Sequence, residues 1–310
     1  MRREWNEHAE IAAIGKIAYS MNEWNRSEQR ARREPQGAAN SDIEKAVILA
    51  RGLGKRMRQP DGAAHLASDQ ARAANAGMKA MIPFGRPFLD FVLSALADAG
   101  FREACLVVAP EHSVIREYYA SLSKRRIEIR FAIQEQPIGT ANAVLAARDF
   151  AGDESFLVLN SDNYYPVEVF RALRTLGEPG LPAFEFEALV RESNIPRERG
   201  QQYALLQVSA DGYLERIVEK PGELPAPGSA GEVYVSMNCW RFSPEIFRAC
   251  EGVPRSARGE FELPEAVQLG VSSLGLRFKA IPFRTGVLDL SFRADISSIA
   301  KRLGEIRVDL

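Results

Sequence analysis

The sequence is poor in cysteine and histidine, and it has no long apolar run. Its three cysteines, Cys105, Cys239 and Cys250, are far apart and form no CxxC pair, which is typical of buried free thiols in a reducing compartment. The three histidines show no metal-ligand spacing, which argues against histidine-based catalysis. No apolar run approaches the roughly 18 residues that a membrane span requires, and the N-terminus does not resemble a signal peptide. We therefore expect a cytoplasmic protein that binds no membrane.

An excess of charge of either sign is also absent. The chain has 40 Lys and Arg residues against 41 Asp and Glu, which gives a formal net charge of −1. This balance gives no reason to expect nucleic acid as a partner. With 310 residues, of which 46% are hydrophobic, the chain is long enough to bury a full core. It fits one large α/β domain with elaborations, or two small domains.

Residues 1–42 differ in composition from the rest of the chain. Charges of both signs alternate from Arg26 to Glu34, and a linker-like segment rich in Gly, Ala and polar residues follows. We predict that residues 1–42 form a flexible N-terminal extension. The domain proper then runs from residue 43 to residue 310.

The first half of this domain, residues 43–176, alternates apolar strand segments with amphipathic helical segments. Such alternation predicts a parallel sheet with helices on both faces. Residues 58–77 interrupt it and predict a long excursion or flap. In the second half, residues 177–310, strands are expected over 184–190 and 232–242, with a hairpin around Asp211-Gly212. We predict a Rossmann-like, three-layer α/β/α fold with a mostly parallel sheet and a β-hairpin elaboration.

The segment Lys45–Met57 opens the domain with an apolar run, Ala46–Ala50, that suits a buried parallel strand. Gly52 and Gly54 follow, and glycine lets backbone N–H groups approach phosphate oxygens closely. Three cations crowd the same turn: Arg51, Lys55 and Arg56. The pattern matches neither the P-loop nor the dinucleotide fingerprint. Taken alone, the segment is compatible with a phosphate-binding loop and with a tight turn that happens to be basic.

Polar side chains end other predicted strands, where sheets of this kind bind ligands. Gln134 ends the third strand, and Asp162 follows the fourth. An aspartate after a buried strand suits a hard divalent cation, although a helix N-cap or a turn also explains it. Asp289 stands in a matching setting after an apolar pair of residues. The two carboxylates are candidates to hold one Mg²⁺, provided that the fold brings them together.

Short motifs recur in a fixed order between about residue 43 and residue 303. The first is L-A-R-G-L-G-K-R-M over Leu49–Met57, and the next is K-A-M-I-P, which begins at Lys79. The later motifs are Q-x-x-x-x-G-T-A from Gln134 to Ala141, Asp162, Glu219-Lys220-Pro221, Asn238, Gly259–Ala266 and Val287–Ile296. In this order they resemble the motifs of the sugar-1-phosphate nucleotidylyltransferases, also known as nucleotide-sugar pyrophosphorylases.

The resemblance implies a GT-A-like fold and transfer of a nucleotide from a nucleoside triphosphate to a sugar 1-phosphate, with Mg²⁺ as cofactor. It implies catalytic roles for Arg56, Lys79 and Asp162, and metal binding by Asp162 and Asp289. The nucleotide-binding residues it implies are Leu49, Ala50, Gly52, Gly54, Gln134, Gly139 and Thr140. The sugar-phosphate-binding residues it implies are Glu219, Lys220 and Asn238. Glutamine at position 134 favours UTP or dTTP as the triphosphate.

The chain departs from the family pattern at four positions. Arg51 and Lys55 replace small residues, Ala204 stands where a sugar-contacting glycine is common, and Ser291 stands where a glycine is common. Two alternatives therefore remain open. One is a catalytically impaired relative that senses a nucleotide sugar, and the other is a nucleotidylyltransferase with a non-sugar phosphate acceptor. Each is compatible with a homo-oligomer.

Overall fold

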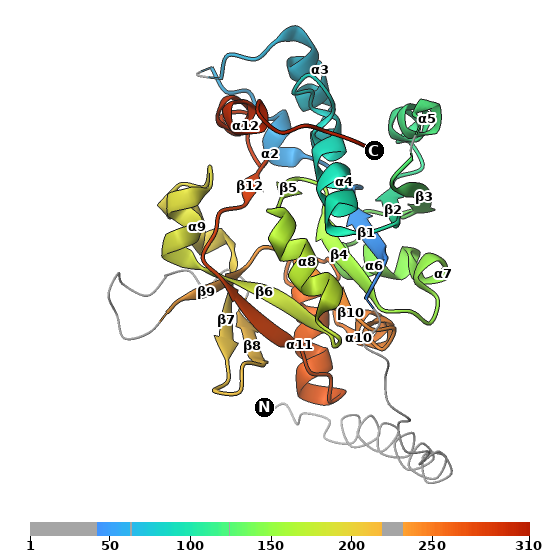
Figure 1. The fold of residues 1–310 in the computed structure, drawn as a ribbon, viewed down its shortest axis with the longest axis vertical. Coiled ribbons are helices and arrows are strands. Elements are labelled where there is room, and N and C mark those ends of the chain that lie inside the picture. The colour runs from blue at the N-terminus through green and yellow to red at the C-terminus, as the bar shows by residue number, and fades with distance from the viewer. Residues whose placement is uncertain (1–41, 63, 124, 219–231) are drawn as a thin grey trace, which may run out of the picture. The chain divides into compact units, whose positions relative to one another are not determined.

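Four parallel strands form the centre of the first half of the domain. β1 (Lys45–Leu49) pairs with β2 (Glu103–Val108) on one side and with β4 (Phe156–Asn160) on the other, and β3 (Glu128–Ile133) pairs with β2. The central strands are apolar and buried on both faces, as is usual for parallel sheets covered by helices. In this computed structural model the described residues fall in four ranges: 42–62, 64–123, 125–218 and 232–310 (Figure 1).

The sheet separates two hydrophobic cores. Side chains alternate along β1, so that Ala46 and Ile48 enter one core and Val47 enters the other. Figure 1 shows helices on both faces of the sheet, chiefly α4 (Phe88–Ala99), α8 (Val167–Thr175), α6 (Thr140–Ala146), α10 (Ile246–Gly252) and α11 (Leu263–Ser273). The predicted α/β fold with a mostly parallel sheet is confirmed.

The second half extends the same sheet with a different strand order. Among the described residues the order is β3-β2-β1-β4-β10-β6-β9-β7-β8, and β11 pairs with β6. β10 runs antiparallel to β4, whereas β11 is parallel to β6. The added strands are β6 (Gly180–Glu185), β7 (Ala204–Val208), β8 (Leu214–Val218), β9 (Tyr234–Ser236), β10 (Cys239–Phe242) and β11 (Lys279–Phe283). β7 and β8 form the hairpin predicted around Asp211-Gly212.

The strand predicted over residues 184–190 is wrong in its C-terminal part. β6 ends at Glu185, and the helix α9 (Phe186–Glu192) begins at the next residue. The Glu185 carboxylate caps this helix by accepting hydrogen bonds from the backbone N–H groups of Glu187, at 3.2 Å, and Ala188, at 2.9 Å. The first N–H groups of a helix have no partner within the helix, and the Glu185 carboxylate supplies one. This stabilises the start of α9 directly after β6, so the strand stops there.

Residues 58–77, predicted as a flap, contain the helix α3 (Ser68–Ala76) after the short helix α2 (Lys55–Arg58). α3 ends at Gly77, which has a φ of 72°, a conformation that favours glycine. The strand predicted over 232–242 is divided into β9 and β10, because Asn238 between them adopts a φ of 59°. The first segment is therefore more structured than predicted, whereas the second is interrupted where one strand was expected.

Short elements complete the domain at the edges of the sheet. They are η1 (Lys79–Met81), α5 (Ser113–Ser121), α7 (Arg148–Ala151), β5 (Asn163–Tyr164), η2 (Arg197–Gln202), β12 (Leu288–Asp289) and α12 (Asp295–Leu303). The predicted extension, residues 1–42, lies outside the described residues apart from Asp42. Within the described ranges, no helix is long and apolar enough to span a membrane.

Candidate active site

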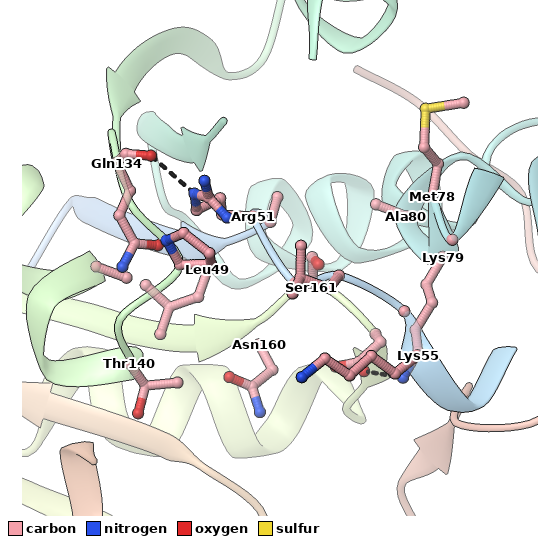
Figure 2. Close-up of a pocket in the computed structure, with 18 of the residues that line it drawn as sticks. Leu49, Arg51, Lys55, Met78, Lys79, Ala80, Gln134, Thr140, Asn160 and Ser161 are labelled. Carbon is pink, nitrogen blue, oxygen red and sulfur yellow. Dashed lines mark hydrogen bonds and ion pairs between the residues drawn. The ribbon is translucent and has the colours of Figure 1, made fainter. Parts of the chain in front are cut away.

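A pocket of about 790 Å³ opens at the carboxyl ends of β1, β3 and β4. This is the edge of a parallel sheet where ligands are expected. The loop after β1, the start of η1, the segment that begins at Gln134 and the turn after β4 together form its wall (Figure 2). The structure therefore gathers around one cavity most of the residues that the sequence motifs single out. They are Leu49, Ala50, Gly52, Gly54, Arg56, Lys79, Gln134, Gly139, Thr140 and Asp162.

The loop between β1 and α2 passes close to the loop before η1. Gly54 has a φ of 59°, and a Cβ atom there would lie 2.3 Å from the carbonyl oxygen of Gly77. Only glycine fits this approach. Gly52 faces open space, since a Cβ atom there would have no neighbour within 4 Å. The backbone at Gly52 is thus left open on the side of the pocket, as close approach of a phosphate requires.

The three cations of this loop point in different directions. Lys55 and Arg56 are exposed and line the pocket. The Arg56 guanidinium lies 5.5 Å from the centre of the Phe292 ring. Arg51 is only 7% exposed, and it donates from Nε to the Gln134 carbonyl oxygen at 2.8 Å and from Nη2 to that of Glu135 at 3.2 Å (Figure 2). Arg51 also lines the pocket, but its hydrogen bonds join the ends of β1 and β3, whereas Lys55 and Arg56 are exposed at the cavity.

The predicted nucleotide-binding residues Gln134, Gly139 and Thr140 lie together in the pocket lining. The Gln134 side chain is 4% exposed, and its Nε2 donates to the Gly139 carbonyl oxygen and to Asn142 Oδ1, each at 2.9 Å. Gly139 has a φ of 119°, and a Cβ atom there would lie 2.3 Å from the Phe261 carbonyl oxygen. The hydroxyl of Thr140 accepts a hydrogen bond from Leu263 N at 2.9 Å. Both Nε2 protons of Gln134 have acceptors within the protein, so its Oε1 is the atom available to a ligand.

Lys79 and Asp162 form an ion pair in the wall of the pocket. Lys79 Nζ donates to Asp162 Oδ2 at 2.9 Å, and both side chains are partly buried, with 18% and 25% of their surface exposed. Lys79 comes from η1 and Asp162 from the turn after β4, so the pair joins segments 83 positions apart. A cation and a carboxylate held this close have the charges that a phosphate group and a divalent metal require.

Asp289 lies beside Asp162 because β12 pairs with β5. The pairing sets Asp289 opposite Asn163, and Leu290 N donates to the Asp162 carbonyl oxygen at 2.9 Å. Asp289 is 5% exposed and lies behind Ser291, whose hydroxyl donates to Asp289 Oδ1 at 2.8 Å. Burial, and to a lesser degree the negative charge of Asp162, raise the pKa of the Asp289 carboxyl above its usual value.

The carboxylates of Asp162 and Asp289 are of the ligand type that would hold a Mg²⁺ ion together with phosphate oxygens and water. Both supply carboxylate oxygens, and Mg²⁺ is usually bound by one or two carboxylates together with substrate phosphates. In the described part of the chain, no group of three or more His, Cys, Asp or Glu residues has a metal-binding arrangement. The donor set therefore suits a metal that arrives with its phosphate, and it does not form an all-protein cage.

The predicted sugar-phosphate residues are not all placed. Asn238 is described, but it lies at the bend between β9 and β10 and is absent from the pocket lining among the described residues. Glu219 and Lys220 lie outside the described residues. Their roles stay predictions.

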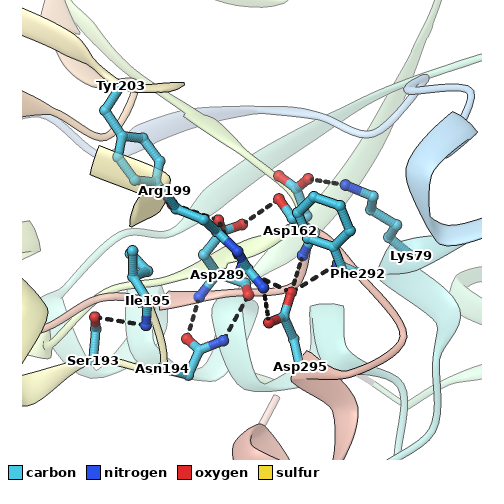
Figure 3. A network of polar contacts seen from close by, with 11 residues as sticks. Lys79, Asp162, Ser193, Asn194, Ile195, Arg199, Tyr203, Asp289, Phe292 and Asp295 are labelled. Atoms are coloured by element: carbon cyan, nitrogen blue, oxygen red, sulfur yellow. Dashed lines mark hydrogen bonds and ion pairs between the residues drawn. The ribbon is translucent and has the colours of Figure 1, made fainter. Parts of the chain in front are cut away.

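The sequence analysis missed three residues that contact Asp289 or approach it closely. They come from the segment between α9 and β7 (Figure 3): Asn194 and Tyr203 form hydrogen bonds with Asp289, and the Arg199 guanidinium lies 4.0 Å from its carboxylate. Their contacts span 86 to 95 positions of sequence, and no local pattern marks them. Only a three-dimensional structure brings them to the site.

The fold and the pocket define an α/β protein of the nucleotidyltransferase class. The family model described as Nucleotidyl transferase matches residues 45–281, and the chain belongs to this family. The family membership predicted from the motifs is confirmed. A crystal structure of UDP-glucose pyrophosphorylase complexed with UDP-glucose has the same fold, with a TM-score of 0.65 at 16% identity, over 86% of this chain and 100% of that one.

Two relatives come from Haloferax volcanii. UTP–glucose-1-phosphate uridylyltransferase AglF is 28% identical over 261 residues, which cover 84% of this chain and 96% of AglF. Low-salt glycan biosynthesis nucleotidyltransferase Agl11 is 28% identical over 226 residues, which cover 72% of this chain and 56% of Agl11. The chain thus spans nearly all of one relative and about half of the other.

Proposed function

We propose that the chain is a Mg²⁺-dependent nucleotidylyltransferase that joins a nucleoside triphosphate and a sugar 1-phosphate and releases pyrophosphate. The observation that carries the proposal is the position of the Lys79–Asp162 ion pair. It lies in the same pocket wall as the glycine-bearing loop after β1, with Asp289 directly behind. The name of the relative AglF, a UTP–glucose-1-phosphate uridylyltransferase, supports this substrate class.

The residues would act chiefly by positioning and by neutralising charge, which is the general pattern of phosphoryl-group transfer. An oxygen of the sugar 1-phosphate attacks the α-phosphorus, and the bond to the pyrophosphate oxygen breaks. Backbone amides at Gly52 and Gly54 bind the triphosphate, Arg56 stabilises the charge on the leaving pyrophosphate, and Lys79 holds the α-phosphate. Asp162 and Asp289 would hold Mg²⁺, which supplies positive charge that neutralises the phosphate oxygens.

UTP and dTTP are the triphosphates that we favour. The free Oε1 of Gln134 is a hydrogen-bond acceptor, and the N3–H of uracil or thymine is a donor. Glu219, Lys220 and Asn238 remain the predicted contacts to the sugar phosphate. A panel of UTP, dTTP, CTP, GTP and ATP, each with Mg²⁺ and several sugar 1-phosphates, tests this assignment through release of pyrophosphate.

Asp162→Ala tests the metal-binding role. Because the variant loses a carboxylate of the proposed Mg²⁺ site, we expect pyrophosphate release to fall about 100- to 1,000-fold, a loss typical of a group that stabilises transition-state charge. The measurement is the initial rate at saturating triphosphate and sugar phosphate, with circular dichroism to check the fold. Near wild-type turnover in Asp162→Ala would remove this residue from the mechanism.

Lys79→Ala tests the contact to the reacting phosphate. We expect most of kcat to be lost, because the variant removes the positive charge that would hold the α-phosphate beside Asp162. Lys79→Arg is the matched control, since it keeps the charge and should recover part of the rate. Unchanged kinetics in Lys79→Ala would contradict the assignment.

One observation favours the sensor alternative. The Ser291 hydroxyl donates a hydrogen bond to Asp289 Oδ1, and Lys79 Nζ donates one to Asp162 Oδ2. Each carboxylate therefore already has a partner within the protein. A protein that senses a nucleotide sugar would gain thermal stability with UDP-sugars and yet release no pyrophosphate. A wild-type chain that releases pyrophosphate with any pair of substrates would exclude this alternative.

A further inference from the structure

The backbone of Asp289 is held on both sides. On one side, β12 pairs with β5, but each of these strands has only two residues. On the other side lies the Asn194 side chain: its Oδ1 accepts from Asp289 N at 2.8 Å, and its Nδ2 donates to the Asp289 carbonyl oxygen at 2.9 Å (Figure 3). The amide thus takes the place of a neighbouring strand. A two-residue strand gains little stability alone, so the side chain supplies what the short sheet lacks.

The same segment also fixes the Asp289 carboxylate. The Tyr203 hydroxyl donates to Oδ2 at 2.7 Å, and Arg199 Nη1 lies 4.0 Å from Oδ2. Arg199 is itself held by Asp295 through two hydrogen bonds, from Nη1 at 3.1 Å and from Nη2 at 2.6 Å. Backbone and carboxylate are therefore both oriented by residues between 194 and 203. These residues precede β7, the first strand of the hairpin.

This arrangement has a specific use at a metal site. Mg²⁺ demands near-ideal octahedral geometry at about 2.0–2.1 Å, so a small displacement of a ligand weakens binding strongly. Removing a side chain that orients a metal ligand typically lowers metal affinity by about 10- to 100-fold. The Asn194 amide satisfies both backbone groups of Asp289 at once, so it fixes the backbone from which this carboxylate projects.

We propose that Asn194 is a positioning residue that sets Asp289 for divalent-metal binding together with Asp162. The inference rests on the proposed function in one respect, which is that Asp289 binds the metal. Asn194 itself touches neither substrate nor metal in this assignment. It acts through the backbone of Asp289.

The test measures how much Mn²⁺ tightens the binding of UTP, or of the triphosphate that binds best in the panel. Affinity is determined by calorimetry for wild type and Asn194→Ala, once with Mn²⁺ and once with EDTA. We expect Asn194→Ala to lose about 10- to 100-fold of the tightening by Mn²⁺. Affinity in EDTA should be unchanged, because Asn194 does not line the pocket among the described residues.

Gln268→Ala is the matched control. Gln268 Oε1 accepts from the backbone N–H of Ile217 at 2.8 Å, so this variant also leaves a strand amide without its side-chain partner, but in the distal hairpin. It should lower the melting temperature and leave the effect of Mn²⁺ intact. Should Asn194→Ala fail to fold, Asn194→Ser serves instead: it adds no charge and keeps a hydroxyl, but this shorter side chain cannot bridge the Asp289 N–H and C=O as the amide does. It should lose the tightening by a smaller factor.

The outcomes separate the inference from the proposed function. Full tightening by Mn²⁺ in a folded Asn194 variant overturns the inference, even where the wild type releases pyrophosphate. A wild type that releases pyrophosphate but binds UTP equally with Mn²⁺ and with EDTA refutes the metal site, and the inference with it. Selective loss of the Mn²⁺ effect in Asn194→Ala supports the inference, even in a chain that releases no pyrophosphate and so contradicts the transfer reaction.

Discussion

Arg51 shows how a single residue can differ from what its sequence position indicates. In the sequence it is one of three cations in the phosphate loop, whereas in the structure it donates two hydrogen bonds to carbonyl groups at the end of β3. Arg51→Met should therefore lower the free energy of unfolding by about 1–3 kcal/mol. Lys55→Met should leave stability unchanged and weaken triphosphate binding, since Lys55 is exposed at the pocket. Urea unfolding and nucleotide titration of both variants check the contrast, and similar effects of the two would contradict it.

His112, also in the pocket wall, gives stability a dependence on pH. Burial lowers the pKa of His112 below 6.5; the negative charge of Glu111 opposes this shift, and the positive charge of Arg51 adds to it. Ala109 N donates to His112 Nδ1 at 3.4 Å, a contact that the protonated ring cannot accept. As the pH falls from about 6.5 towards the lowered folded pKa, the unfolded chain therefore binds a proton that the folded chain does not, so stability decreases as the pH decreases through this window. Unfolding measured between about pH 7.5 and 5.5 should show a steeper loss in wild type than in His112→Asn. Parallel curves would contradict this.

Among the elements, the loop between β1 and α2 contains two glycines in different environments: Gly54 is tightly packed, and Gly52 faces open space. Gly54→Ala places a non-glycine residue in the left-handed conformation, which costs about 1–2 kcal/mol. It also places a Cβ atom 2.3 Å from the Gly77 carbonyl oxygen, which is a steric clash. We expect the loop to move and triphosphate affinity to fall at least about tenfold. The control Gly52→Ala meets no neighbour within 4 Å, so its melting temperature should match wild type. Equal melting temperatures for both variants would refute the packing argument.

Elements marked by hydrophobic spacing in the local sequence were predictable, whereas those whose boundaries depend on one side-chain cap or one unusual backbone conformation were not. The apolar run of β1 and the helix over Phe88–Ala99 follow from hydrophobic spacing and from the glycine after the helix. The helix over Phe186–Glu192 was missed because a glutamate side chain, not one of the usual capping residues, provides its cap. The break at Asn238 was missed because its positive φ depends on the strands around it.

At the scale of the whole molecule, the candidate site was predictable where chain order sufficed. The motifs from Leu49 to Asp162 follow the strands in sequence, and parallel strands place their carboxyl ends at one edge. Asp289 was predicted from its setting, but what holds it was not. Asn194 lies 95 positions from Asp289 and reaches it through an amide group that carries no charge and fits no pattern. Such contacts follow from tertiary packing, which one sequence does not display.

The opposite edge of the sheet serves stability, and this separation can be tested. Arg241 in β10 lies opposite Leu157 near the start of β4, is 3% exposed, and donates to the carbonyl oxygens of Leu173 at 3.0 Å and Arg174 at 2.8 Å. These carbonyls belong to the last turn of α8, where the backbone N–H of Leu176 reaches the Leu173 oxygen at a long 3.5 Å and that of Ile43 reaches the Arg174 oxygen at 3.1 Å. Arg241→Met should therefore cost about 1–3 kcal/mol in urea unfolding and leave kcat unchanged. Lys79→Ala should do the reverse, because it alters the carboxyl edge. A fall of kcat in a fully folded Arg241→Met would show that the two edges are coupled.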